Sequence, residues 1–178
     1  MEAVTEYLRK ARSSTLATFQ QAYPYLFFYK HPKVVRERRE FDSDIDYATR
    51  TIDMNFDPMP GEPQLVAIKK NPENPFPDRL TIGRATNCDV VIRFAFVSKV
   101  HAHLFIQVDK LTLRDNKASN ATFHNHRKLE PGSSRSVKLG DILSFGALDL
   151  ELADAGRIYE ILRTTGATGT VAPGRSRA

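Results

Sequence analysis

The spacing of hydrophobic positions changes along the chain, and the first part has helical spacing. From Val4 to Tyr23, apolar residues fall on a stripe with intervals of three and four residues, and Pro24 ends it. This pattern predicts a helix over about residues 2–22. The residues that follow are aromatic, then charged, then acidic and rich in proline, which is typical of an extended linker. We therefore interpret residues 1–60 as an N-terminal arm, a helix followed by a linker.

From residue 61 the period of the apolar positions falls to two. Ala102–Val108 and Leu148–Leu152 alternate apolar and polar side chains, and Asn, Pro and Gly separate such segments. Many short alternating segments, with no helical pattern of useful length, indicate an all-β antiparallel sandwich or barrel over residues 61–163. About 100 residues can bury a core of their own. The small, polar residues 164–178 are expected to form a disordered tail.

Composition narrows the class of protein. The longest apolar run, Tyr25–Tyr29, is far shorter than the roughly 20 residues that cross a bilayer, and the acidic N-terminus has no apolar signal segment. The single cysteine, Cys88, excludes an internal disulfide and suits a reducing compartment. These features predict a cytoplasmic protein without membrane contact.

Charge points to an anionic partner without identifying it. The net charge is +5, and residues 61–163 carry fifteen Lys and Arg against twelve Asp and Glu. A mild basic excess on a folded module favours anionic partners. The chain lacks the dense Lys/Arg runs of a dedicated duplex-binding protein, so a nucleic-acid partner is not expected.

Three segments carry candidate binding chemistry. The first is Gly83-Arg84 at the end of a predicted strand, where glycine permits a close backbone approach and arginine offers a planar donor fork for phosphate or carboxylate. The second holds Ser98 and Lys99, a hydroxyl and an ammonium that could donate to one anion, with His101 placed to brace their loop. Each signal is weak when taken alone.

The third segment is a loop rich in Asp, Asn and hydroxyl side chains. It contains Ser119 and Asn120, whose polar groups can bond the backbone of a ligand or of the loop itself. Both interpretations are open at this point.

Taken together in this order and spacing, five motifs resemble the forkhead-associated (FHA) domain. The motifs are Ile82-Gly-Arg84, Cys88-Asp-Val-Val-Ile92, Val97-Ser-Lys-Val-His-Ala102, Ser119-Asn-Ala-Thr-Phe-His-Asn125 and Leu139-Gly-Asp-Ile-Leu-Ser-Phe-Gly146. The resemblance covers residues 61–163 and leaves the arm and the tail outside it.

The resemblance implies an eleven-stranded antiparallel β-sandwich whose loops at one end bind phosphothreonine in an extended peptide. Arg84 and Ser98 would bond the phosphate, and Lys99 would add a second cation. Ser119 would lie near the phosphothreonine, and Asn120 would hold the peptide backbone. Gly83 and His101 would support the architecture of the site.

The function implied by the resemblance is that of a non-enzymatic adaptor in Ser/Thr-kinase signalling. Its partner would be a Thr-phosphorylated protein or peptide, such as a kinase or a kinase substrate, and no cofactor or metal is expected. Thr49 and Thr51 lie in an acid-flanked segment, so they form a candidate intramolecular ligand once phosphorylated.

Two residues depart from the pattern of the resembled family. Ala121 stands where an Asn-Gly-Thr sequence is common, and His126 follows Asn125 where an Asn-Gly turn is common. If these positions need a positive φ, the alanine carries strain of roughly 1–3 kcal/mol. Histidine tolerates that conformation better than most residues.

Other functions remain open at the level of sequence. His101/His103 and His124/His126 are His-x-His pairs that could chelate a metal in a metalloenzyme. Ser98, His101 and Asp115 could in principle form a hydrolase triad, although the sequence has no nucleophile-elbow pattern. A β-sandwich that binds protein without phosphate, or that binds nucleic acid, is a further alternative.

Overall fold

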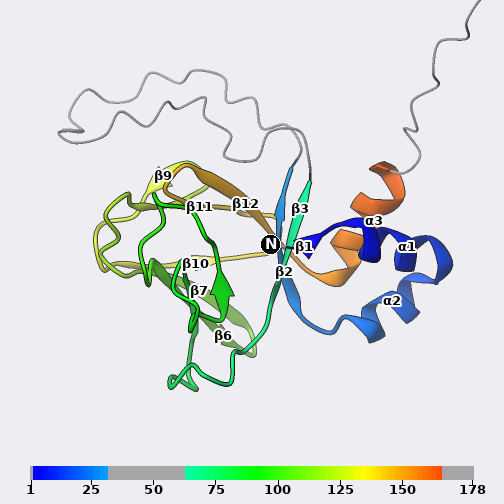
Figure 1. Ribbon diagram of the computed structural model, residues 1–178, viewed down its shortest axis with the longest axis horizontal. Coiled ribbons are helices and arrows are strands. Elements are labelled where there is room, and N and C mark those ends of the chain that lie inside the picture. The colour runs from blue at the N-terminus through cyan, green and yellow to red at the C-terminus, as the bar shows by residue number, and fades with distance from the viewer. Residues whose placement is uncertain (1, 32–62, 166–178) are drawn as a thin grey trace, which may run out of the picture.

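The computed structural model describes residues 2–31 and 63–165, which form a β-sandwich with a group of helices at its side (Figure 1). The helices are α1 (Thr5–Ser13), α2 (Leu16–Ala22) and α3 (Ala155–Thr165). The strands are β1 (Glu2–Ala3), β2 (Leu26–Lys30), β3 (Gln64–Ile68), β4 (Leu80–Gly83), β5 (Val90–Val91), β6 (Ala102–Gln107), β7 (Lys110–Asp115), β8 (Thr122–His124), β9 (Arg127–Lys128), β10 (Ser134–Val137), β11 (Ile142–Phe145) and β12 (Leu148–Ala153).

The strands form two sheets. The larger has the order β1-β3-β2-β12-β11-β8-β9, and the smaller has the order β10-β7-β6-β4-β5. Among the described strands, β4 and β5 are parallel and the other pairs are antiparallel. Ten strands, β3 to β12, lie within the expected residues 61–163, and the eleventh, β2, comes from the expected arm. The two-residue β1 is added beside β3. The prediction of an all-β sandwich with a helical N-terminal part is therefore confirmed.

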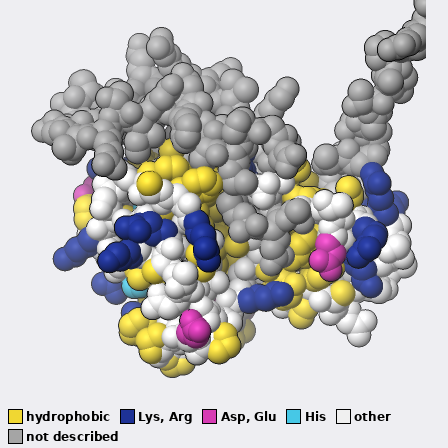
Figure 2. Space-filling view, viewed as in Figure 1, with side chains coloured by type: hydrophobic (Ala, Val, Ile, Leu, Met, Phe, Trp, Pro, Cys, Tyr) yellow, Lys and Arg dark blue, Asp and Glu magenta, His cyan; other side chains and the backbone are white. Residues whose placement is uncertain are grey.

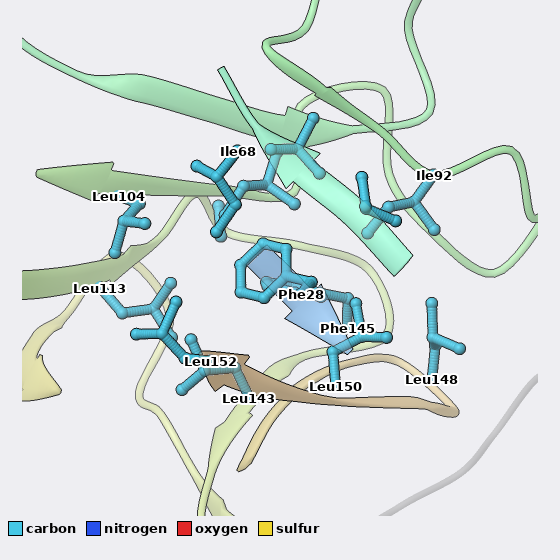
Figure 3. Packing of buried hydrophobic residues seen from close by; sticks show 14 of the residues in the cluster. Phe28, Ile68, Ile92, Leu104, Leu113, Leu143, Phe145, Leu148, Leu150 and Leu152 are labelled. Atoms are coloured by element: carbon cyan, nitrogen blue, oxygen red, sulfur yellow. The ribbon is translucent and has the colours of Figure 1, made fainter. Parts of the chain in front are cut away.

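The main core lies between the sheets, where the alternating strands point their apolar side chains (Figure 3). Leu104 and Leu113 come from the smaller sheet, and Phe28, Phe145 and Leu152 come from the larger. All five side chains are fully buried. Fully burying such a side chain contributes about 1.5–3 kcal/mol, so this layer supplies much of the stability that holds the loops at both ends of the sandwich.

Strand β2 places part of the expected arm inside the larger sheet. It lies between β3 and β12, with Phe28 opposite Val66 and Leu152. Phe28 faces the main core, whereas Phe27 belongs to a second apolar cluster on the outer face of the sheet. The arm is thus continuous with the sandwich.

The three helices cover that outer face. Tyr7 of α1, Phe19 of α2 and Ile158 of α3 pack with Phe27 in the second cluster. Tyr7 and Phe27 meet edge to face with ring centroids 5.6 Å apart. This cover explains why both faces of β2 are apolar.

Two expectations about helices are wrong in detail. The single helix expected over residues 2–22 is divided at Ser14 and Thr15, where the Thr15 hydroxyl accepts a hydrogen bond from the Thr18 amide and caps α2. Helix α3 lies where no helical pattern was recognised. The Asp154 carboxylate accepts the Arg157 amide at 2.8 Å at its start, and α3 includes the first residues of the expected tail.

Several predictions fall on other parts of the chain. The described residues leave out three segments on which predictions were made. These are most of the expected linker, the segment with Thr49 and Thr51, and residues 166–178 of the expected tail. Among the described helices, none combines the length and the apolar character needed to cross a membrane.

Candidate functional site

The predicted site residues lie on three connections at one end of the sandwich. Arg84 follows β4, Ser98 and Lys99 precede β6, and Ser119 and Asn120 follow β7. The register pairs Ile82 of β4 with Ala102 of β6, and Ala102 with Asp115 of β7. Because these three positions are neighbours across the smaller sheet, the end of β4, the start of β6 and the end of β7 meet at the same edge.

Backbone hydrogen bonds join the first two connections. The Arg84 amide donates to the Ser98 carbonyl at 3.0 Å, and the Ala85 amide donates to the Lys99 carbonyl at 3.1 Å. A Cβ added to Gly83 would lie 2.2 Å from the Lys99 carbonyl oxygen, which is far inside contact distance. Glycine is therefore required here to bring the Arg84 segment against the Ser98 segment.

His101 ties the second connection to the third. Its Nδ1 accepts a hydrogen bond from the Ser98 amide at 3.1 Å, and its Nε2 lies 3.0 Å from the Ala121 carbonyl oxygen. An amide can only donate and a carbonyl can only accept, so the ring is neutral with its proton on Nε2. Burial lowers the pKa of His101, although the Ala121 hydrogen bond opposes that shift.

Ser98 also contacts the third connection through its side chain. Its Oγ accepts a hydrogen bond from the Ser119 amide at 3.2 Å, which leaves the hydroxyl proton able to donate elsewhere. Arg84 and Lys99 are exposed. The site therefore combines two exposed cations with a hydroxyl that its neighbours hold in place.

Asn120 is anchored through one side of its amide. Its Nδ2 donates to the Phe96 carbonyl at 2.8 Å, which fixes the orientation of the amide and leaves Oδ1 as an acceptor. A Cβ on Gly146 would lie 2.9 Å from the Phe96 ring and 3.4 Å from the Asn120 Cβ. The β11–β12 turn at Gly146 thus packs against Phe96 and Asn120.

Sequence reasoning did not assign Phe96, Gly146 or Asp115 to this support. The buried Asp115 carboxylate accepts the Thr122 hydroxyl at 2.6 Å and the Lys117 amide at 2.7 Å, so it shapes the loop that carries Asn120. Asp115 stands directly before an Asx-rich loop, and this position is the sequence signal that could have identified it.

The hydrolase triad does not form. Both ring nitrogens of His101 are occupied by backbone groups, and the Ser98 group at Nδ1 is the amide rather than the hydroxyl. No nitrogen is left to relay a proton between Ser98 and Asp115.

The His-x-His pairs are used in other ways. The Nε2 atom of His124 lies 2.8 Å from a carboxylate oxygen of Asp141. Burial lowers the pKa of His103, and the nearby charges of Arg79 and Arg114 lower it further. Within residues 2–31 and 63–165, no group of three or more His, Cys, Asp or Glu side chains is arranged to hold a metal ion.

The two departures from the family pattern do occupy left-handed conformations. Ala121 has φ +51°, and Asn125 and His126 have φ +48° and +65°. Ala121 therefore carries the strain expected for a residue with a Cβ in this region. The Asn120 amide keeps its bond to Phe96 despite that strain.

Comparison with known proteins gives the family of this site. The family model of the FHA domain matches residues 80–146, which hold every predicted site residue. Residues 80–146 belong to an FHA domain. Over 78 residues the chain is 33% identical to an ABC transporter ATP-binding/permease protein of Mycobacterium tuberculosis, a match that covers 44% of the chain and 9% of the transporter.

Solved FHA domains resemble the chain over about half of its length. The FHA-2 domain of a Mycobacterium tuberculosis ABC transporter is 32% identical, with 45% of this chain and 71% of that domain covered and a TM-score of 0.39. The N-terminal FHA domain of Rad53p from S. cerevisiae, solved with a phosphothreonine peptide, is 24% identical, with 47% and 73% covered and a TM-score of 0.40.

Proposed function

We propose that this FHA domain binds a phosphothreonine peptide at the end of the sandwich that carries Arg84, Ser98 and Asn120. The observation that supports the proposal most directly is the hydrogen-bonded junction of the three connections. A phosphothreonine carries about −1.5 to −2 charge and three acceptor oxygens. The junction offers two exposed cations and a hydroxyl donor on a rigid frame.

Each predicted residue then has a distinct role. The Arg84 guanidinium and the Ser98 hydroxyl donate to the phosphate, and Lys99 adds charge beside them. Ser119 lies next to the phosphothreonine, because its amide is bonded to Ser98 Oγ. The Asn120 Oδ1 accepts a backbone amide of the peptide, while its Nδ2 stays on Phe96.

Gly83 and His101 act through other residues. Gly83 allows the Arg84 segment to approach the Lys99 carbonyl, and His101 holds the Ser98 amide and the Ala121 carbonyl at fixed positions. Preorganised donors lose little conformational entropy on binding, so these two positioning residues raise affinity without touching the ligand.

At the level of the cell, we infer a non-enzymatic, cytoplasmic adaptor in Ser/Thr-kinase signalling. The partner would be a Thr-phosphorylated protein or peptide, including a kinase or its substrate. The mild basic excess of residues 61–163 favours such an anionic partner. No cofactor enters this function.

Isothermal titration with a degenerate phosphothreonine peptide library and its unphosphorylated twin tests the proposal. Losing a charged partner at such a site costs on the order of 2–5 kcal/mol, so Arg84→Ala should weaken phosphopeptide binding by about thirtyfold or more. Arg127→Ala, which removes an exposed arginine of the β8–β9 hairpin, is the matched control and should bind normally.

Two results would overturn the proposal. Equal binding of both libraries by the wild-type chain would show a phosphate-independent surface. If the chain instead binds nucleic acid with an affinity that falls steeply with salt and does not change when phosphothreonine peptide is added, it is a nucleic-acid-binding protein.

A further inference from the structure

The helices cover only part of the outer face of the larger sheet. The apolar cluster beneath the helices contains residues of β2, β3 and β12, but none of β8 or β11. Figure 1 shows the helices on one side of β2 and β3, with β9 and β11 on the other side. The outer faces of β8 and β11 therefore lie beyond the cover that the helices supply.

The strand register joins four outward side chains into one row. The residues before and after Ser144 on β11 belong to the main core, so Ser144 points to the outer face. In the register, Ser144 lies between Asp149 of β12 and Phe123 of β8. Lys128 of β9 lies opposite Phe123. Residues directly opposite each other in antiparallel strands point the same way, and we call these four residues the outer row.

The outer row is partly apolar and holds a buried hydroxyl without a partner. Phe123 is half-buried, and so is Ile142, which lies two residues from Ser144 on the same face. Ser144 is fully buried, and its Oγ makes no hydrogen bond with any described residue. Figure 2 shows hydrophobic side chains along the upper part of the sandwich, where Figure 1 places β9, β11 and β12. A segment that supplied a hydrogen bond and removed these apolar groups from water would be stabilised here.

The chain itself arrives at one end of the outer row. Tyr29 of β2 lies opposite Glu151 of β12. Two residues further along the same antiparallel register, His31 comes beside Asp149. The His31 Nε2 lies 2.5 Å from the Glu151 carboxylate, and the His31 and Tyr29 rings meet edge to face with centroids 4.7 Å apart. His31 therefore leads the chain out at the Asp149 end of the outer row.

The segment between β2 and β3 is much longer than its two ends require. Lys30 lies opposite Gln64, so about two to five residues could join the strands, yet residues 31–63 stand between them. Neighbouring strands are about 4.8 Å apart, so the way from β2 to β9 is about 19 Å, which about six extended residues cover. The segment is therefore long enough to cross the outer row and return to β3.

The order of charges along the segment matches the order along the outer row. Residues 33–39 carry four Lys and Arg against one Glu, and residues 40–57 carry six Asp and Glu against one Arg. The row begins at β12 with the half-buried Asp149 and ends at β9 with the exposed Lys128. A segment that crosses the row from His31 brings its cations to the carboxylate and its anions to the ammonium.

The acidic part of the segment also has apolar side chains that can cover the row. Ile52-Asp-Met-Asn-Phe56 alternates apolar and polar positions, and Phe41, Ile45 and Tyr47 come before it. An alternating segment can turn its apolar side toward Phe123 while its carboxylates stay in water or beside Lys128.

We propose that residues 33–57 of this chain dock on the outer row, with the basic part at the β12 end and the acidic part at the β9 end. The docking requires no phosphate. It uses none of the residues of the proposed peptide site, so each proposal can fail without the other.

Hydrogen exchange of the full chain, read by mass spectrometry, tests this proposal. The amides of residues 33–57 should exchange at least about tenfold more slowly in the wild type than in a synthetic peptide of the same sequence. Lys128→Glu places a like charge beside the acidic part, and Phe123→Ser removes the apolar contact. Each variant should restore the exchange rate of the peptide, and circular dichroism checks that both keep the fold.

Two controls complete the test. Arg127→Glu makes a matching charge change on the neighbouring residue of β9, which alternation places on the opposite face, so exchange should stay slow. Arg84→Ala should also leave the exchange slow. Fast exchange in Arg84→Ala would place the segment at the FHA site and would overturn the proposal. A wild type whose segment exchanges as the peptide does also overturns it, and so does slow exchange that both outer-row variants leave unchanged.

Discussion

At the scale of single residues, the site depends on a few contacts that allow one side chain only. Gly83 has no room for a methyl group because of the Lys99 carbonyl, whereas Gly140 has open space around its Cβ position. His101 uses both ring nitrogens on backbone groups. These two residues therefore give the clearest tests of how the site is supported.

Gly83→Ala should destabilise the fold and weaken peptide binding together. Forcing a methyl group against backbone costs about 1–3 kcal/mol or more, because the Lys99 segment must move. Gly140→Ala is the control. Alanine at the Gly140 φ of +87° costs about 1–2 kcal/mol, but this position lies away from the FHA site. Urea unfolding measures the stability of both variants, and titration with the phosphopeptide measures their affinity. If Gly83→Ala loses no more stability than Gly140→Ala and binds the peptide normally, this account of Gly83 is contradicted.

His101 should make the fold less stable in mild acid. Its pKa lies below the ordinary value because burial disfavours the imidazolium. The unfolded chain therefore takes up a proton first as the pH falls below about 6.5, and the free energy of unfolding declines there. Above that pH this contribution is fully present.

An NMR titration of the His101 ring checks the prediction directly. Its resonances should report a pKa below that of an unfolded histidine, and the Nε2 proton should be slow to exchange. A ring that titrates at the ordinary value would rule out the buried neutral form.

At the scale of elements, β2 decides where the domain begins. It is bonded on one side to β3 and on the other to β12, so the larger sheet is interrupted without it. A chain that starts at residue 61, the predicted boundary, lacks this strand and should fail to fold cooperatively. Urea unfolding followed by circular dichroism, with the full chain as reference, tests this, and a sharp transition in the shorter chain would refute it.

Elements with a clear period could be predicted from the sequence, and elements without one could not. The alternation in Ala102–Val108 and Leu148–Leu152 correctly indicated β6 and β12. Strand β2 has no alternation, because Phe27 faces the helices while Phe28 faces the main core. Helix α3 escaped notice because Gly156 stands in its first turn.

The candidate site shows the same division. The residues on the three connections were found because their motifs are local. The packing of Gly146 against Phe96 and Asn120 was not found, since it joins positions far apart in the sequence. The φ of Ala121 also depends on the loop that Asp115 closes, and a single sequence cannot show it.

At the scale of the whole molecule, the two apolar clusters share the same strands. Phe27 and Ala153 point to the helices, and Phe28 and Leu152 point to the sandwich core. The buried Glu151 carboxylate also joins the parts, since it bonds His31 at 2.5 Å and Arg157 of α3 at 2.8 Å. If the helices or the smaller sheet came away, one face of β2 and β12 would be exposed to water, and these two strands also carry the apolar cluster on the other face.

Helices and sandwich should accordingly unfold in one transition. Helical circular dichroism and hydrogen exchange in β6 and β7 should report the same free energy of unfolding. Loss of helical signal at a lower urea concentration than the loss of strand protection would show that the helices are an independent unit.

The place of β2 has a consequence for how the chain is made. The ribosome releases the N-terminus first, so Phe28 emerges 124 positions before its partner Leu152. Until β12 has been synthesised, β2 has an unpaired edge, and both of its faces lack part of their cover. Folding of the sandwich must then wait until β12 has left the ribosome. The nascent chain spends that interval with its most aromatic segment exposed, which is the stage at which a chaperone would be of most use to it.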